Sequence, residues 1–181
     1  MLRKILIALV VIATGLLALI ASRPDSFQIA RSTTIAAPAD VVFPLINDFH
    51  GWAKWSPWAE LDPNMKLTYT GAASGPGSVY EWAGNDKVGE GRMTLTDSKP
   101  NEKIGIKLEF MKPFTATNTT TFTIKPESGG VTVNWDMAGQ NNFMAKAVSL
   151  FMNMDKEIGG DFEKGLAKLK SVAEAKARED K

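Results

Sequence analysis

The sequence predicts an α+β protein in which a curved antiparallel sheet wraps around one long C-terminal helix, preceded by a single membrane-spanning helix. Three observations support this prediction. Residues 5–22 form an uncharged apolar run, residues 27–137 contain a series of short strand-like segments, and apolar residues recur at helical spacing within 143–176. The links between the strand-like segments are too short for helical crossovers, so we expect an antiparallel meander. Such a sheet must bury one face, and the long helix can cover it.

The apolar run at residues 5–22 is predicted to anchor the chain in a membrane. As a helix it would span about 27 Å, close to the thickness of a bilayer core. A cleaved secretory signal is the competing interpretation, but the run is long for one, and Leu19 is bulky where a cleavage site needs a small residue. Arg3 and Lys4 favour a cytoplasmic N-terminus, which in a bacterial cell would place the remaining chain in the periplasm.

Length and composition fit a single globular domain behind this anchor. Of the 181 residues, 44% are hydrophobic and 23% are charged, which is typical of a folded globular domain. We therefore expect an anchor at residues 1–23, one domain at 24–176 and a charged tail at 177–181.

Composition also excludes several kinds of chemistry. The chain has no cysteine, which rules out disulfides, thiolate catalysis and cysteine-based metal sites. Its one histidine, His50, cannot form a histidine-rich metal site. The net charge is +1, without the concentrated positive field that a nucleic-acid binder needs. We therefore expect no cofactor, no metal ion and no nucleic-acid partner.

The domain is predicted to begin with a strand and a short helical region. Residues 27–35 (FQIARSTTI) alternate and are rich in β-branched side chains, as in a strand. Pro38 then opens a helix as its first residue, and Pro44 shortens or kinks that helix. Residues 50–58 (HGWAKWSPW) are predicted to form a compact aromatic helix or turn.

Strand-like segments follow in close order, separated by turn residues such as glycine, proline and asparagine. Apolar and charged side chains alternate most cleanly in residues 104–110, which is typical of a strand with one buried face. The predicted strands are residues 67–70, 78–83, 89–97, 104–110, 114–124 and 131–137.

Residues 143–176 are predicted to form the long helix, with apolar side chains on one side and lysine and glutamate on the other. Gly159 and Gly160 lie within this pattern and are expected to bend or loosen the helix, since glycine costs about 1 kcal/mol relative to alanine there. Asp155 lies near the apolar stripe. We expect it to sit at the edge of the stripe or to pair with a basic group such as Arg92, because burial of an unpaired carboxylate is costly.

Several short sequence words run along the domain in a recognisable order. They are IAAPADVVFPLINDF, GWAKWSPWAELDP, YTGAASGPGSVYEWAGN, VGEGRMTL, KPF, VTVNWDMAG and DFEKGLAKLK. Together these words resemble the START-like superfamily, also called SRPBCC or the polyketide cyclase/dehydrase and lipid-transport family. The resemblance covers roughly residues 27–173, and the order and spacing of the words are more specific than any single one.

The resemblance implies a helix-grip fold with an apolar cavity between the sheet and the long helix. Members include lipid carriers, aromatic cyclases, hormone receptors and co-chaperone domains, so the resemblance implies a fold far more than an activity. The tryptophans of residues 50–58 would then cap one end of the cavity or lie at a membrane interface. Combined with strand and helix periodicity, the resemblance assigns to the cavity Tyr80, Trp82, Met93, Leu95, Leu108, Phe110, Phe114, Asn118, Thr120, Phe122, Trp135, Met137, Phe151, Met152 and Ile158.

Two polar residues, Asn118 and Thr120, lie on the predicted cavity face of residues 114–124. Three interpretations stay open: they lie at the cavity mouth, they bond to neighbouring backbone, or they orient the polar end of a ligand. The opposite face of the same strand is an unbroken row of threonines that is expected to meet solvent, namely Thr115, Thr117, Thr119, Thr121 and Thr123.

The leading hypothesis is a membrane-tethered protein that binds a lipid or another small hydrophobic molecule in this cavity. The alternative is an enzyme of the cyclase or dehydrase type, with Tyr80 or Arg92 as candidates for its chemistry. No nucleophile with a matching base can be identified from the sequence, so no catalytic residue is assigned. A third hypothesis is a protein-interaction module that uses the threonine-rich sheet face or the aromatic segment.

Overall fold

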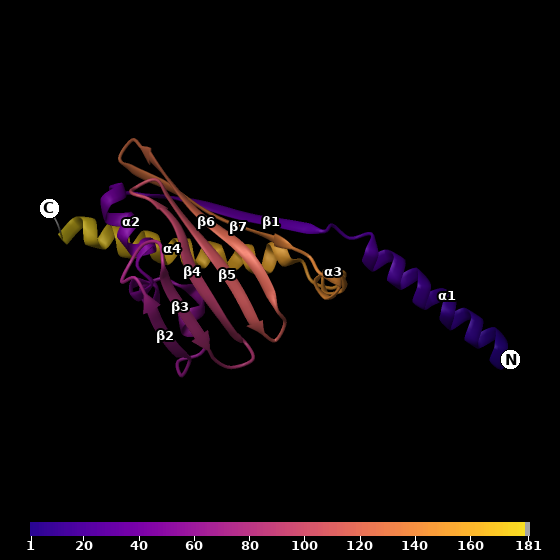
Figure 1. The fold of residues 1–181 in the computed structure, drawn as a ribbon. Helices are drawn as coiled ribbons and strands as arrows, with labels where there is room; N and C mark the ends of the chain where they lie inside the picture. The colour runs from indigo at the N-terminus through magenta and orange to yellow at the C-terminus, as the bar shows by residue number, and fades with distance from the viewer. Residues whose placement is uncertain (180–181) are drawn as a thin grey trace.

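A computed structural model describes residues 1–179 and contains one curved antiparallel sheet with a long helix across its concave face (Figure 1). The strands are β1 (Ser26–Ile35), β2 (Lys66–Gly71), β3 (Ser78–Ala83), β4 (Glu90–Lys99), β5 (Lys103–Lys112), β6 (Ala116–Glu127) and β7 (Gly130–Gln140). Their order across the sheet is β1-β7-β6-β5-β4-β3-β2. The predicted α+β class and the antiparallel meander are confirmed, and the first strand closes the sheet beside the last.

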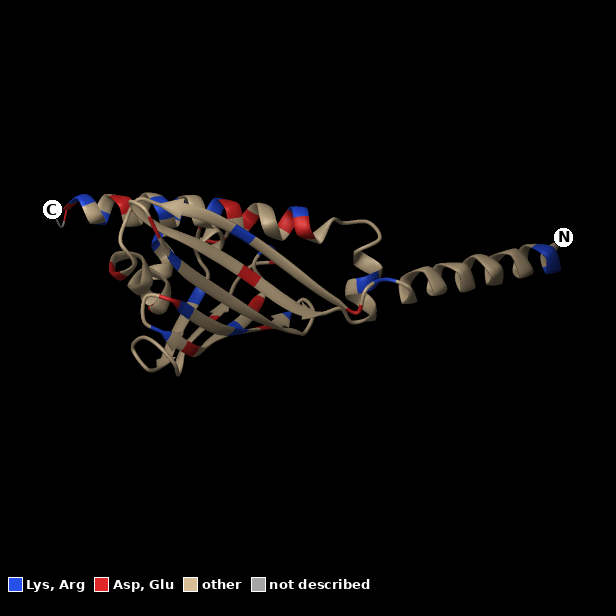
Figure 2. Ribbon diagram, turned by 90° about the horizontal axis from the view of Figure 1, so that it is seen from above, with Lys and Arg blue, Asp and Glu red and all other residues tan. Residues whose placement is uncertain are grey.

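The N-terminal helix α1 (Leu2–Ala21) projects away from the domain (Figures 1 and 2). All its side chains are exposed except that of Ile20, which is 6% exposed. Figure 2 shows charge only at the beginning of this helix. By length and composition, α1 suits either a membrane span or a signal sequence.

Between β1 and β2 the chain forms three short helices. The first is α2 (Ala39–Asn47), with Pro44 inside it. Pro38 has an extended backbone and precedes the helix, so it is not the first helical residue that the sequence predicted. The aromatic segment forms two 3₁₀ helices, η1 (Phe49–Lys54) and η2 (Pro57–Glu60).

Two tryptophans fix η1 against α2. Trp52 donates its indole N–H to the carbonyl oxygen of Ile46, and Trp55 donates to that of Leu45, each at 2.9 Å. Both tryptophans are buried, so these bonds satisfy N–H groups that would otherwise lie unpaired in an apolar interior. The aromatic segment is therefore part of the core.

The C-terminal pattern forms two helices rather than the single one predicted. The helix α3 (Phe143–Val148) is followed by a break at residues 149–153 and then by α4 (Met154–Glu179), which crosses the concave face of the sheet (Figure 1). The interruption does not fall at Gly159 and Gly160, which both continue within α4.

Capping side chains explain the position of the break. Asn142 and Asn153 each accept a hydrogen bond from the backbone N–H three residues further on, at 2.8 and 3.1 Å. Such caps mark helix starts, so the segment contains two starts. At its other end α4 includes residues 177–179 of the predicted tail, and residues 180–181 lie outside the described part of the chain.

The core is aromatic where α4 meets β7. Trp135 of β7 stacks on Phe162 of α4 with ring centroids 4.1 Å apart. Trp55 packs edge-on against Trp135 and Phe122 lies tilted against it, with centroid distances of 5.7 and 4.8 Å. Each of these buried side chains contributes about 1.5–3 kcal/mol through apolar burial. Gly165 permits the close approach, because a Cβ there would lie 2.9 Å from the Trp135 ring.

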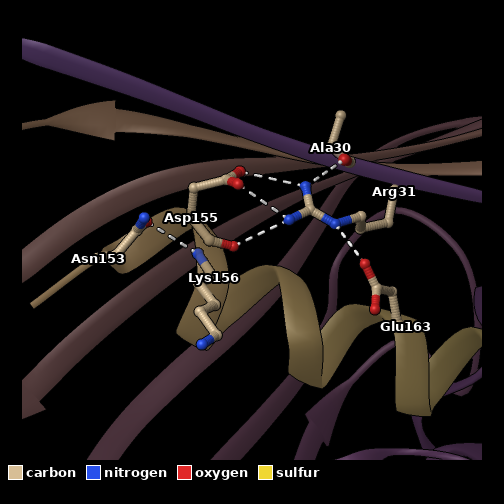
Figure 3. Close-up of polar contacts among 6 residues, drawn as sticks. All are labelled: Ala30, Arg31, Asn153, Asp155, Lys156 and Glu163. Atoms are coloured by element: carbon tan, nitrogen blue, oxygen red, sulfur yellow. Dashed lines mark hydrogen bonds and ion pairs between the residues drawn. The ribbon is translucent and has the colours of Figure 1, made fainter.

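Arg31 of β1 fixes the start of α4 to the sheet (Figure 3). Its Nε donates to Glu163 Oε1 at 2.8 Å, and its two terminal nitrogens donate to the Asp155 carboxylate at 3.1 and 3.0 Å. These hydrogen bonds lower the pKa of Asp155 below its ordinary value. Asp155 thus pairs with Arg31 and not with Arg92, which contacts Glu81 at 2.6 Å.

Gly159 makes room for this arrangement. A Cβ at position 159 would lie 2.1 Å from Arg31 Nη2, which is inside van der Waals contact. Gly160 differs, because nothing lies within 4 Å of a Cβ built there. The first glycine therefore has a steric role that the second lacks, although both reduce helix propensity by about 1 kcal/mol relative to alanine.

We predict that the effect of Gly159→Ala on stability depends on Arg31. In an Arg31→Ala background the substitution should stabilise the protein by about 1 kcal/mol, because alanine is the better helix former. With Arg31 present this gain should be lost, because the added methyl group displaces the guanidinium. Urea unfolding of the wild type, both single variants and the double variant measures the coupling.

Gly160→Ala is the matched control, and it should stabilise the protein by about 1 kcal/mol in both backgrounds. Additive effects of Gly159→Ala and Arg31→Ala would contradict the steric explanation. A coupling as large for Gly160→Ala as for Gly159→Ala would contradict it too.

Candidate ligand-binding site

A cavity of about 970 Å³ lies between the concave face of the sheet and the helices. Small-molecule sites in proteins commonly have volumes of about 300–1,000 Å³. The inner faces of β3 to β7 form one wall, and η1, η2, α3 and the first turns of α4 complete it. Most of the lining side chains are apolar.

Most of the side chains that the sequence assigned to the cavity do line it. Strand alternation places most of them on the concave face, and the rest come from the β5–β6 connection, the break at residues 149–153 and the start of α4. They are Tyr80, Trp82, Met93, Leu108, Phe110, Phe114, Asn118, Thr120, Trp135, Met137, Phe151, Met152 and Ile158.

Leu95 and Phe122 were assigned to the cavity but lie in the packed core, where both are fully buried. The Phe122 ring packs edge-on against Trp52 and Trp55, with centroids 6.0 and 6.1 Å apart. Both residues are on the predicted concave face. However, α2 and η1 pack against the end of the sheet where these two residues lie. Strand alternation predicts which face a side chain is on, but it does not predict where along the strand the packed core gives way to the cavity.

The floor of the cavity carries two polar side chains. Asn118 and Thr120 of β6 are 7% and 4% exposed and line the cavity. Asn118 Nδ2 donates to Met137 Sδ at 3.8 Å, which is a weak hydrogen bond for a buried amide. A Cβ at Gly139 would lie 2.1 Å from Asn118 Oδ1, so this glycine provides the space that the amide occupies. The pair can therefore offer a donor and acceptors to a molecule in the cavity.

Tyr80 and Trp82 of β3 form an aromatic wall. Trp82 donates its indole N–H to the carbonyl oxygen of Val88 at 2.9 Å. A Cβ at Gly91 would lie 2.3 Å from the Trp82 ring, so this glycine lets the ring lie across β4. Burial raises the pKa of Tyr80 to about 12, so its phenol is neutral at physiological pH. Tyr80 can donate a hydrogen bond there but cannot serve as a base.

The cavity mouth is apolar and exposed. Among the lining residues, Phe151 in the break is 86% exposed and Phe114 between β5 and β6 is 58% exposed. The charged lining residues Arg23, Lys87 and Asp161 are exposed or half-buried, so charge stays away from the buried floor.

His50 lies outside the lining. Its ring stacks on Tyr69 with centroids 4.3 Å apart, and its Nδ1 is 2.8 Å from Asp48 Oδ1. Among residues 1–179, no group of three or more His, Cys, Asp or Glu side chains is placed to hold a metal ion. The polar groups of the cavity wall therefore include amide, hydroxyl and phenol groups and the indole N–H of Trp135, which has no hydrogen-bond partner in the described part of the chain, and charge lies only at the edge of the cavity.

Helical periodicity did not predict that α3 lines the cavity. Residues 143–176 were expected to form one continuous helix, with their apolar side chains along a single stripe. The capping asparagines Asn142 and Asn153 are the signal that could have located the break. The apolar lining residues that were missed include Phe27, Met144, Ala145, Val148 and Leu150.

Several solved structures resemble this fold. Protein CV1439 from Chromobacterium violaceum has a TM-score of 0.59 and 17% identity, with 84% of this chain and 99% of that chain covered. The Aha1 dimer from Colwellia psychrerythraea has a TM-score of 0.59 and 14% identity, with 82% and 96% covered. The di-domain ARO/CYC StfQ from the steffimycin biosynthetic pathway has a TM-score of 0.61 and 12% identity, with 84% and 52% covered. At these identities the likeness shows the fold alone.

No curated protein matches this sequence. Residues 26–174, however, match the family model described as polyketide cyclase / dehydrase and lipid transport. The match begins with β1 and ends within α4, so it includes every strand of the sheet and nearly the whole cavity wall. The chain therefore belongs to the polyketide cyclase/dehydrase and lipid-transport family, which its sequence words had indicated.

Proposed function

We propose that this protein binds a small hydrophobic molecule, such as a lipid or an isoprenoid, in the cavity while α1 tethers it to a membrane. The observation that carries the proposal is the cavity of about 970 Å³ with its mainly apolar lining and its buried polar pair. Burial of apolar ligand surface would supply the affinity, at roughly 25 cal/mol per Å². Costs of association and ordering reduce the net gain.

The polar pair indicates what the ligand's buried end contains. Asn118 offers both a donor and an acceptor, and Thr120 offers a hydroxyl that can do either. The charged lining residues are exposed or half-buried, so the floor provides no countercharge for an ionised group. We therefore expect a neutral end with a hydroxyl or carbonyl group, attached to an apolar body.

The protonation and pairing of the polar groups that line the cavity favour ligand binding over catalysis. Tyr80 is held neutral by its pKa of about 12. Asp161 contacts Lys164 at 2.9 Å. Among the described residues that line the cavity, no acid and base lie within hydrogen-bond distance of one another. Nucleophilic catalysis, in which a base activates a neighbouring nucleophile, needs such a pair.

The tether is proposed from α1. A helix with uniformly exposed apolar side chains from Ile5 to Leu19 is poorly suited to water and well suited to a bilayer. The positive charges of Arg3 and Lys4 favour a cytoplasmic N-terminus, which would place the cavity domain outside the cytoplasm. The ligand would then be held directly beside the membrane.

We predict that the full-length protein, purified in a mild detergent, carries a copurified hydrophobic molecule. Native mass spectrometry after release from the micelle should detect an added mass, and lipid extraction should identify it. Ala116→Trp should remove that mass, because Ala116 lines the cavity and an indole would occupy part of its volume. Thr117→Trp is the control, since it places the same side chain on the exposed outer face. Retention of the ligand by Ala116→Trp, or an empty wild-type protein in repeated preparations, would contradict the proposal.

Asn118→Leu is predicted to weaken ligand binding without lowering stability. Leucine approximately preserves the volume but removes the amide, and the lost hydrogen bond should reduce affinity about five- to tenfold. Stability should stay level or rise, because the buried amide donates only weakly to Met137 Sδ. Competition binding with the identified ligand and thermal unfolding provide the two readouts. Asn134→Leu on the opposite face of β7 is the control, and an equal loss of affinity in both variants would refute the orienting role.

A further inference from the structure

Exposed apolar side chains are concentrated around the cavity mouth. Within residues 24–179, large apolar side chains are exposed at Leu61 and Leu67 and otherwise only in residues 111–114 and 143–154. A concentration of this kind marks an interaction surface. The rim patch is defined here as Phe114, Phe143, Met144, Phe151, Met152 and Met154, all of which except Phe143 also line the cavity.

The C-terminal end of α1 is held against the same region. Arg23 Nε donates to Ser149 Oγ at 3.1 Å, and Arg23 Nη2 donates to the Ser149 carbonyl oxygen at 3.0 Å. The backbone N–H of Asn141 donates to the Asp25 carbonyl oxygen at 2.7 Å, and Asn141 Nδ2 donates to that of Pro24 at 3.0 Å. These four bonds connect the segment after α1 to both ends of α3.

The connection between α1 and the sheet is also short. The helix ends at Ala21, β1 begins at Ser26, and the residues between them reach at most about 14 Å when fully extended. Ile20 is buried although it belongs to an otherwise exposed helix. Figure 1 shows α3 next to the C-terminal end of α1. A bilayer that contains α1 would therefore meet α3 and the break that follows it.

We infer that the rim patch inserts into the membrane that holds α1, so that the cavity opens onto the bilayer and its ligand passes between lipid and cavity without entering water. This inference rests on the proposed tether. The mouth and the membrane then form one continuous apolar path. Arg23 is exposed and lies beside the patch, where it can face the phosphates of lipid headgroups.

A lipid surface fits this patch better than a protein partner does. Its members are phenylalanines and methionines on a six-residue helix, the break, the first residue of α4 and a hairpin end. Methionine adapts to varied shapes, so these side chains do not require one fixed partner surface. Phenylalanine on a short amphipathic segment is favourable at the boundary of headgroups and acyl chains. The connection between α1 and β1 is short, so a bilayer that contains α1 would already lie close to the rim patch.

The absence of cysteine makes a direct test available. Single-cysteine variants of the full-length chain can be labelled with the fluorophore NBD and reconstituted into phosphatidylcholine vesicles that contain nitroxide-labelled lipid. Phe151→Cys reports on the rim patch, Leu9→Cys on the tether, and Thr119→Cys on the exposed outer face of the sheet. We expect blue-shifted emission and strong quenching at positions 151 and 9, and neither at 119.

The outcomes separate the inference from the proposed function. Quenching at position 9 with none at 151 overturns insertion of the rim patch and leaves the tether intact. A label at 151 that is blue-shifted but unquenched by the nitroxide lipid also overturns it, because it places the patch against protein. Absence of quenching at position 9 means that the tether itself has failed.

A paired substitution gives an independent readout. Phe143→Asp combined with Phe151→Asp should return a label at Met152→Cys to the emission seen in water, because two carboxylates oppose insertion. Leu61→Asp combined with Leu67→Asp is the control, since these exposed apolar residues lie outside the rim patch. Both pairs affect exposed side chains, so circular dichroism should show an unchanged fold. The inference is overturned if the label at position 152 still shows blue-shifted emission in the Phe143→Asp, Phe151→Asp variant. It is also overturned if both double variants lose the blue shift equally.

Discussion

The concave face of the curved sheet is covered by packed side chains at one end and by a cavity at the other. Trp135 lies at the boundary between the packed core and the cavity. Its ring stacks on Phe162 of α4 at 4.1 Å and also lines the cavity. On one side, Trp55 and Phe122 complete a close-packed core. On the other, α3, the break and the first turns of α4 border the cavity. A single helix cannot cover a curled sheet of this size, and the remaining space becomes the cavity.

Much of this arrangement follows from local sequence patterns, because alternation in a strand determines which side chains share a face. The strands, the concave face and most cavity residues could therefore be predicted. Leu95 and Phe122 could not be separated from the others, because their burial depends on how α2 and η1 pack. The break before α4 was missed because helical periodicity continues across it. Asp155 pairs with a basic group, as expected, but that group is Arg31 instead of the Arg92 offered as an example, because Arg31 is distant in sequence and reaches Asp155 only through the β1–α4 contact.

Glycine shapes the cavity wall as much as the large side chains do. Trp82 is paired with Gly91 across β3 and β4, and Asn118 is paired with Gly139 across β6 and β7. In both cases a Cβ on the glycine would overlap the partner's side chain. The wall therefore receives an indole and an amide that lie across the neighbouring strand instead of pointing straight into the interior. A substitution at such a pair would reshape the cavity wall and leave the strand pairing in place, which is the kind of local change by which one fold can serve different functions.

The short segment from Ser22 to Asp25 has a consequence for how a tethered domain would meet other molecules. A domain on a long flexible linker samples a wide hemisphere and can reach partners at many heights. Here the hydrogen bonds of Arg23 and Asn141 remove that freedom. The domain would keep one orientation relative to the membrane normal and would travel only by lateral diffusion. Any protein that exchanges ligand with it would have to reach the cavity mouth at one fixed height above the bilayer.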